Sequence, residues 1–333
     1  MTSVHEDDMC NTNEPDLKNV KSGELNVWNK INSQLKKSIN NFVNDILSTQ
    51  LKYRYQIYIF NKMFDLNVYN SNIKKNCVKY IESFIIFTYR NTPIPNCHKN
   101  INNDIGYTDK EILNFCAGNS SNALFGLTNI VKLIMNDGKD PINFIGPNAA
   151  AFIFRNARQQ YESTNLPHIY VAVNSTIYIN DLKYLCFNKN PNDTFTPTIV
   201  LIPIRLGATN KINSIYLSAL KLLFNEKEFT GFVGGRIKGA FYFVGYQREN
   251  FIVLNPHHCQ ENANIENSGI ESYRCQKMHT LKSKKIDPTC MLSFYLANVE
   301  SYTYFIKNIR SIIESKDKST AQLFAYDDRH HVT

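Results

Sequence analysis

Apolar residues in the N-terminal part of the chain recur at helical spacing. One stripe follows steps of three and four residues, which would place it on one face of a helix: Trp28, Ile31, Leu35, Ile39, Phe42 and Ile46. A second helix is predicted over residues 72–89, and Thr108 with Glu111 forms a capping-box pattern that predicts a helix start. Residues 1–25 contain few large apolar residues, which predicts a disordered tail.

The pattern changes after the middle of the chain, where short β-branched runs end at turn residues. These runs predict strands at 168–173, 176–179, 199–205, 231–236, 240–246, 251–254 and 291–297. Residues 247–250 would join two of them as a hairpin, and helical spacing returns at 212–224 and 301–313. Helices followed by an antiparallel sheet favour an α+β fold over a doubly wound parallel one.

Domain limits follow from where this patterning stops. The residues from Lys316 on are mostly polar and charged, so 316–333 are predicted to form a flexible C-terminal tail. The folded domain is therefore expected to span residues 26–315.

Composition excludes several classes of protein. The chain has 333 residues, of which 43% are hydrophobic and 12% aromatic, so it can bury a real core. No signal peptide is recognisable, and the apolar runs are shorter than a membrane span requires. The eight cysteines are widely spaced, which favours free thiols in a reducing compartment. The net charge of +8 is spread without a basic cluster. We therefore expect a cytoplasmic monomer with no transmembrane segment and no nucleic-acid partner.

The densest set of chemically active residues is Leu254-Asn255-Pro256-His257-His258-Cys259-Gln260, directly after a predicted strand. An Asn beside a His suits a general base and the group that orients it. A second interpretation is a turn at Asn255-Pro256 with exposed histidines. Metal binding through these residues with Cys275 and His279 is not expected, because no Cys-x-x-Cys spacing is present. Gly234-Gly235 indicates a close approach between strands, not a nucleotide-binding loop.

Five segments in and before this region are distinctive in order and spacing: Pro203-Ile204-Arg205-Leu206-Gly207, Ile212-Asn213-Ser214-Ile215-Tyr216, Phe232-Val233-Gly234-Gly235-Arg236, Tyr242-Phe243-Val244-Gly245-Tyr246 and Leu254-Asn255-Pro256-His257. They resemble the autophagins, the autophagy-related cysteine proteases. Supporting matches include Thr88-Tyr89-Arg90 and Phe144-Ile145-Gly146-Pro147-Asn148. The resemblance covers about three-quarters of the chain.

This resemblance implies a papain-like α+β fold with a small extra subdomain and no cofactor. Autophagins are cysteine-type endopeptidases that cut after the C-terminal glycine of a ubiquitin-like autophagy modifier. The freed glycine is joined to phosphatidylethanolamine, and the same enzymes later remove the lipid. The implied partner is therefore this modifier, either free or linked to phosphatidylethanolamine.

The resemblance also assigns roles to individual residues. His257 takes the place of the catalytic base, and Asn255 stands where the family has Asp. Tyr89 matches the tyrosine that helps to form the oxyanion hole. Phe144 matches an aromatic residue that covers the channel for the glycine tail, and Arg205 matches an arginine linked to substrate handling. The alternatives for the last two are a core Phe and a surface salt bridge.

The nucleophile is the point where the sequence departs from the family. Aligned without a gap from Thr88, the family's Asp-x-Gly-Trp-Gly-Cys segment falls on residues 104–109, and Asp109 replaces the cysteine. A carboxylate cannot act as the thiolate does, but at a helix start it could pair with a protonated His257. Cys116 would lie two helical turns beyond Asp109. Cys97 and Cys259 lie nearer in sequence to the site segments, but neither opens a helix.

Three hypotheses follow for function. The leading one is a degenerate autophagin homologue that at most binds the modifier. The second is an active thiol protease that uses another cysteine, and the third is a scaffold that has also lost modifier binding. Trp28-Asn29-Lys30-Ile31 has the form of a short motif that docks on the modifier, although Trp28 and Ile31 also belong to the helical stripe.

Overall fold

The computed structural model describes thirteen stretches of the chain: residues 49–50, 56–66, 71–82, 89–90, 123–141, 143–161, 166–187, 195–236, 239–257, 259–260, 273–275, 279–314 and 321–331. The stripe that begins at Trp28, the helix start at Thr108 and the possible docking motif lie outside these residues. Within them, no helix is long and apolar enough to cross a membrane.

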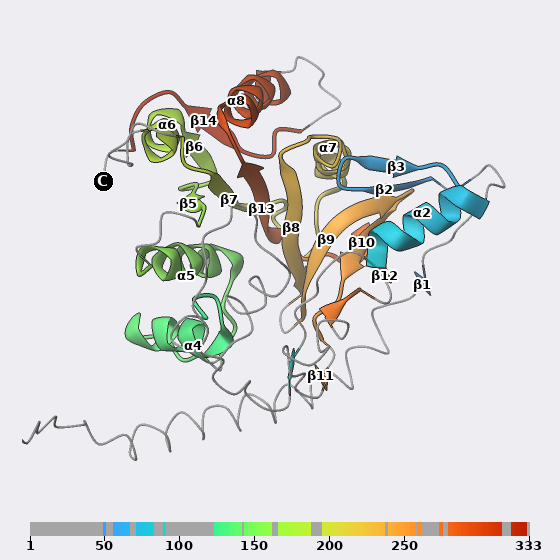
Figure 1. The fold of residues 1–333 in the computed structure, drawn as a ribbon, viewed down its shortest axis with the longest axis horizontal. Coiled ribbons are helices and arrows are strands. Elements are labelled where there is room, and N and C mark those ends of the chain that lie inside the picture. Colours follow the sequence, from blue (N-terminus) through green and yellow to red (C-terminus); the bar gives the residue numbers. More distant parts are fainter. Residues whose placement is uncertain are drawn as a thin grey trace, which may run out of the picture.

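A mixed β-sheet forms the centre of the fold (Figure 1). Its main path, in spatial order, is β1 (Thr49–Gln50), β12 (His279–Lys282), β10 (Asn250–Leu254), β9 (Gly239–Gln247), β8 (Phe229–Arg236), β13 (Thr289–Leu296), β7 (Thr198–Arg205) and β5 (His168–Val171). Neighbouring strands on this path run antiparallel except β5 and β7, which are parallel. The strands predicted from the sequence are confirmed, including the β9–β10 hairpin.

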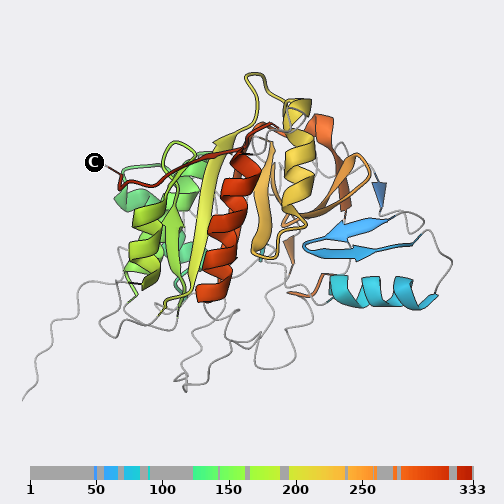
Figure 2. The same cartoon turned by 90° about the horizontal axis from the view of Figure 1, so that it is seen from above.

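Helices cover both faces of this sheet. On one face, α5 (Pro147–Gln159) packs on β5, β7 and β13, and α4 (Leu127–Asn136) packs against α5. On the other face lie α6 (Ile179–Phe187), α7 (Leu217–Leu223) and α8 (Val299–Glu314), which Figure 2 shows side by side. The architecture is therefore α+β, as predicted, although α4, α5 and α6 were not predicted.

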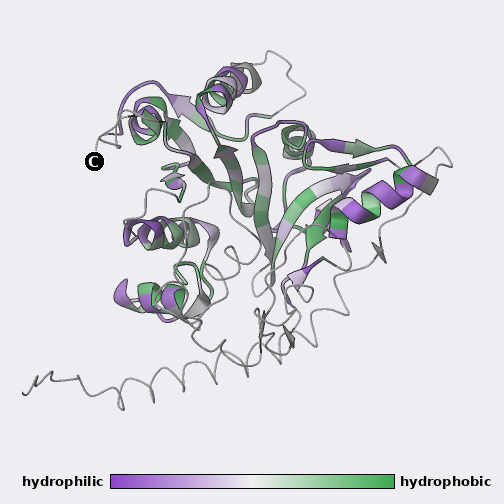
Figure 3. Cartoon of the chain, in the orientation of Figure 1, coloured by the Kyte–Doolittle hydropathy of each residue, from purple (hydrophilic) through white to green (hydrophobic). Residues whose placement is uncertain are grey.

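Alternation along the strands explains why both faces are covered. Leu201 faces the α5 side while its neighbour Ile202 joins the core under α6, α7 and α8. The core under α6, α7 and α8, which we call the main core, is rich in phenylalanine. The rings of Phe232 and Phe243 stack with centroids 4.2 Å apart, and Phe251 meets both edge-on. Figure 3 shows the corresponding hydrophobic colouring along the central strands.

A small unit lies at the β12 end of the sheet. It consists of the hairpin β2 (Ile57–Ile59) and β3 (Lys62–Phe64), which pairs with β9, and of α2 (Ser71–Glu82). Cys77 and Ile81 of α2 are buried in the core beneath it. The helix predicted over 72–89 therefore ends earlier than expected, because Tyr89 and Arg90 form β4 and pair with another strand. Here a tertiary pairing overrides the local helical pattern.

The prediction of a flexible C-terminal tail is wrong for residues 321–331, which we call the C-terminal strap. Strand β14 (Ala325–Asp327) of the strap pairs in parallel with β6 (Thr176–Tyr178). Leu323 and Phe324 are buried in the main core, and their apolar side chains explain why this charged segment is held in place.

Two glycines allow strands to approach closely. A Cβ atom at Gly235 would lie 2.3 Å from the carbonyl oxygen of Gly239, which confirms the close approach predicted for Gly234-Gly235. A Cβ atom at Gly245 would lie 1.9 Å from the carbonyl oxygen of Tyr58. Side chains larger than hydrogen would therefore push β8 from β9 at the first position and β2 from β9 at the second.

We predict that Gly245→Ala lowers the free energy of unfolding by about 3 kcal/mol, because the atom it meets is backbone and cannot move aside. Gly146→Ala is the matched control: the nearest atom to its added Cβ is the Phe144 ring at 3.9 Å, so the loss should stay below about 1 kcal/mol. Denaturant titration measures both values. Equal losses in the two variants would contradict the proposed steric cause.

Candidate functional site

The candidate site begins where β10 ends. Strand β10 stops at Leu254, and the next residues place Asn255 and His257 in buried positions with exposed fractions of 4% and 6%. The backbone N–H of His257 donates to Asn255 Oδ1 at 3.0 Å, which closes a short turn around Pro256. The turn expected at Asn255-Pro256 is present, but the alternative in which the histidines are exposed is wrong for His257. His258 lies outside the described residues.

Asn255 also fixes the chemical form of the His257 ring. Nδ1 of His257 lies 2.7 Å from Asn255 Oδ1, the same oxygen that accepts from the backbone N–H of His257. Reversing the amide would bring its NH₂ group against that N–H, so the oxygen must face the ring. Nδ1 therefore carries the proton, and Nε2 is the basic nitrogen of the neutral imidazole. This is the form that a general base needs.

Phe241 packs against one side of the His257 imidazole. Its ring lies 5.4 Å from the His257 ring, centroid to centroid, at an interplanar angle of 70°. Phe241 is itself 1% exposed, at the start of β9, so it keeps water from that face of the histidine. Sequence reasoning missed this residue, because only the pairing of β9 with β10 brings it to the site.

The amide donor of Asn255 has no partner in the part of the chain that the structure describes. Its Nδ2 group is buried, and none of the described residues accepts a hydrogen bond from it. A buried donor without an acceptor costs about 1–3 kcal/mol. An aspartate carboxylate, which the resemblance to the autophagins implies for this position, would carry no such donor.

Tyr89 comes to the site through a parallel strand pair. Strand β4 (Tyr89–Arg90) pairs with β11 (Cys259–Gln260), and Tyr89 is directly opposite Cys259. Cys259 is two residues beyond His257. The structure thus brings the backbone at Tyr89 next to the His257 segment.

Arg205 lies at the same end of the sheet as His257 but not beside it. It ends β7, four strand positions from β10, which corresponds to about 19 Å at the usual strand spacing. Its guanidinium donates to Thr289 Oγ1 at 2.8 Å and to the carbonyl oxygen of Thr209 at 3.0 Å. These described partners are uncharged, so the alternative of a surface salt bridge is not what is observed.

Phe144 precedes the N-terminus of α5 and has an exposed fraction of 55%, so the alternative of a core Phe is wrong. An exposed aromatic side chain suits a residue that covers a substrate. Asp109, Cys97 and Cys116 lie outside the described residues, and the structure does not place them.

The described thiols are poorly suited to be nucleophiles. Cys77, Cys186, Cys275 and Cys290 are buried, and Cys77, Cys186 and Cys290 form no disulfide with another described residue. Burial raises the pKa of the Cys77 and Cys186 thiols to about 11, and it raises the pKa of Cys290 further still, with nearby Asp287 adding to the effect. Since the thiolate is the reactive form, none of these three sites favours it. Within the described residues, no three His, Cys, Asp or Glu side chains are grouped to hold a metal ion.

The hydrogen-bond geometry predicts one tautomer for His257. We expect its ¹⁵N chemical shifts, in the neutral form, to show a protonated Nδ1 and an unprotonated Nε2. Asn255→Ala should remove this preference, because the accepting oxygen is lost. Asn213→Ala is the matched control, since the Asn213 side chain caps a different turn. A neutral ring with the proton on Nε2 and none on Nδ1 would contradict the assignment.

Comparison with known proteins adds the family. The profile of the peptidase C54 catalytic domain matches residues 108–308, which include Phe144, Arg205, Asn255 and His257. The cysteine protease ATG4C of Xenopus tropicalis is 30% identical over 242 residues, covering 72% of this chain and 52% of that protein. Human cysteine protease ATG4C is 29% identical over 219 residues, covering 64% of this chain and 48% of that protein.

The chain spans about half the length of the curated relatives it matches. A mixed sheet with helices agrees with the papain-like fold that the resemblance implies. Because the C54 profile covers more than half of the chain and includes the buried histidine with its orienting side chain, this protein belongs to the peptidase C54 family, the autophagin cysteine proteases.

Proposed function

We propose that this chain is a catalytically degenerate autophagin that binds the ubiquitin-like autophagy modifier without cleaving it. One observation carries the proposal: the basic half of the site is built, with His257 buried and oriented, while the aligned nucleophile position holds Asp109. A carboxylate at that position lacks the polarisable thiolate that attacks the peptide carbonyl.

The two substitutions in the site compensate each other electrostatically. In this proposal Asp109 is ionised at a helix N-terminus and pairs with a protonated His257. An aspartate at position 255 would add a second negative charge beside the proposed pair of Asp109 and His257, which already includes the carboxylate of Asp109. The neutral Asn255 still accepts the Nδ1 proton and leaves the pair balanced, although it cannot stabilise the imidazolium by charge.

Retained modifier binding is supported by the residues away from the nucleophile. Phe144 is exposed before α5, and Arg205 is exposed at the end of the sheet that carries His257. We propose that they contact the C-terminal tail and body of the modifier, free or linked to phosphatidylethanolamine. We further propose a cytoplasmic monomer that needs no cofactor.

The active-protease alternative requires a cysteine other than the three with raised thiol pKa values. Cys259 is the candidate that the described backbone favours, since it lies two residues from His257 and opposite Tyr89. It is in a strand, however, and would lack the helix N-terminus that lowers the pKa of a catalytic thiol. The scaffold alternative differs from the leading proposal only in the absence of modifier binding.

The central test is cleavage of a tagged modifier precursor. We expect no cleavage by the unmodified protein and measurable cleavage by Asp109→Cys, because that variant restores the sulfur. Asp109→Asn is the matched control, since it removes the charge without adding a thiol, and it should stay inactive. Adding Asn255→Asp to Asp109→Cys should increase the rate, because a carboxylate stabilises the imidazolium that forms during catalysis.

Cleavage by the unmodified protein would overturn the proposal. If neither Asp109→Cys nor its combination with Asn255→Asp cleaves the precursor, the site has lost more than its nucleophile. A pull-down with the immobilised modifier then distinguishes the two hypotheses in which the protein is inactive. Retention of the protein on the modifier favours the binding role, and no retention favours the scaffold.

Thiol labelling tests the active-protease alternative directly. With iodoacetamide near pH 6.5, we expect the four described thiols to remain unlabelled in the folded protein, because all of them are buried: Cys77, Cys186, Cys275 and Cys290. The raised pKa of Cys77, Cys186 and Cys290 also leaves little of the reactive thiolate. All four should react in denaturant. Peptide mass spectrometry identifies the sites, and rapid labelling of Cys97, Cys116 or Cys259 under native conditions would support an active thiol.

A further inference from the structure

The C-terminal strap is attached to the domain in the way that a peptide is added to an open strand edge. Residues 325–327 pair with β6 in parallel, and the N–H of Ala325 donates to the carbonyl oxygen of Ser175 at 3.0 Å. Figure 1 shows β14 beside β6 and next to α8. The strap lies beyond residue 308, where the match to the peptidase C54 profile ends.

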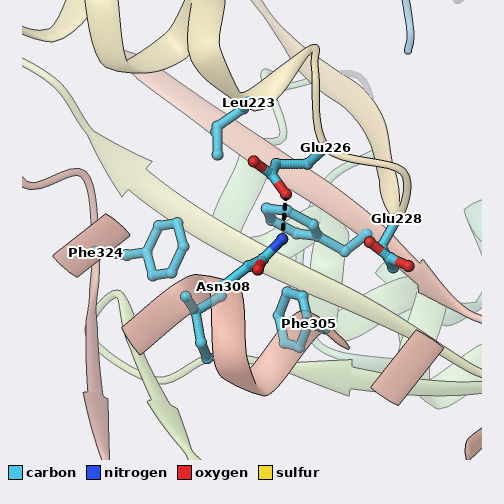
Figure 4. A pocket seen from close by; sticks show the side chains of 8 residues that line it. Leu223, Glu226, Glu228, Phe305, Asn308 and Phe324 are labelled. Atoms are coloured by element: carbon cyan, nitrogen blue, oxygen red, sulfur yellow. Dashed lines mark hydrogen bonds between the residues drawn. The ribbon is translucent and has the colours of Figure 1, made fainter. Parts of the chain in front are cut away.

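Phe324 anchors the strap in an apolar pocket. Its ring lies 6.2 Å from Phe294 of β13, and the pocket is also lined by Phe305 and Ile309 of α8 and by Leu223 of α7. Figure 4 shows Phe324 at one side of this pocket, with Asn308 bonded to Glu226 across it. Phe324 is one of the eight residues that line this pocket.

Polar contacts hold the remainder of the strap at the surface. Asp181, in the first turn of α6, accepts from the backbone N–H of His331 at 2.9 Å and lies 2.6 Å from His330 Nδ1. Arg310 of α8 pairs with Asp328 and lies over the Tyr326 ring at 5.4 Å. These side chains recognise an extended segment by its backbone, its aromatic residues and its carboxylates.

We propose that β6, α6 and α8 form a peptide-binding groove that the C-terminal strap occupies in cis as a replaceable strand. The partner that fits is an extended peptide with an aliphatic–aromatic pair, then a second aromatic residue and an acidic residue. Strand addition of this kind draws affinity from backbone hydrogen bonds and selectivity from side-chain pockets. Strands β6 and β14 form a two-stranded sheet of their own, separate from the main sheet whose strand β10 leads to Asn255 and His257.

The contacts of the strap are few enough for exchange without unfolding of the domain. The pairing involves three residues on each strand, and the ion pairs with Arg310 and Asp181 are at partly exposed side chains, where such pairs contribute little. Leu323 and Phe324 supply most of the buried apolar surface. Segments with this contact density open locally at lower free energy than a core strand such as β13.

Competition between a free peptide and the strap tests the proposal. The probe is a fluorescent synthetic peptide with the sequence of residues 321–331, added to the full chain and followed by anisotropy. Phe324→Ala in the full chain should increase peptide affinity about tenfold or more, because the weakened strap no longer fills the groove. The same peptide carrying Phe324→Ala should bind neither protein. Tyr304→Ala is the matched control, an exposed aromatic residue of α8 that does not line the pocket.

Equal affinity of the unmodified chain and the Phe324→Ala variant, or no binding to the folded variant, would overturn the proposal. If Phe324→Ala does not fold, Ala325→Pro takes its place, since it removes the bond to Ser175 and leaves the pocket residues intact. Hydrogen exchange of the unmodified protein gives an independent readout. Amides of 325–327 should exchange well before those of β13, and exchange only with global unfolding would refute a replaceable strand.

Discussion

The pairing of β9 with β10 is the constraint on which the candidate site depends. The register shifts between Ile252 and Val253, so that Leu254 lies opposite Tyr242. Without this bulge, Leu254 would lie opposite Phe243 and Asn255 would follow opposite Tyr242, whose side chain points to the other face of the sheet. The one-residue shift brings the Asn255 segment alongside Phe241 instead, and Phe241 is the residue that packs on the His257 ring. A bulge in a hairpin thus decides which aromatic residue of β9 lies beside the histidine.

Burial strengthens the interaction between Asn255 and His257 and makes unpaired polar groups beside them costly. Asn255 and His257 lie where water is largely excluded, so the hydrogen bond between them is strong and the orientation of the ring is specific. The same exclusion of water makes it costly that the Nδ2 group of Asn255 has no acceptor among the described residues, and it makes any unbalanced charge more costly still. The protein has the catalytic-domain match of the peptidase C54 family together with a buried histidine that is oriented by a neutral amide.

Much of the fold is predictable from the sequence, for physical reasons that also explain the failures. Strands β7, β9, β10 and β13 are β-branched or aromatic runs bounded by turns, and such local signals survive folding. His257 and Asn255 are found because their types and order carry chemistry. Phe241 is not, because its role arises from register. The early end of α2 and the order of the strap arise from pairings between distant segments, and residues near Lys316 look flexible when Leu323 and Phe324 are weighed only against their charged neighbours.

The parallel pairing of β4 with β11 has a consequence for how the protein folds. Tyr89 and Cys259 are roughly 170 positions apart, so their contact closes a very long loop and adds strongly to the contact order of the chain. The hairpin that carries Asn255 and His257 closes a short loop by comparison and can form early. A folding chain would thus hold an oriented histidine before Tyr89 arrives beside it. The last step of folding, not the first, would complete this part of the structure, and forms trapped before that step would be compact but lack the pairing of β4 with β11.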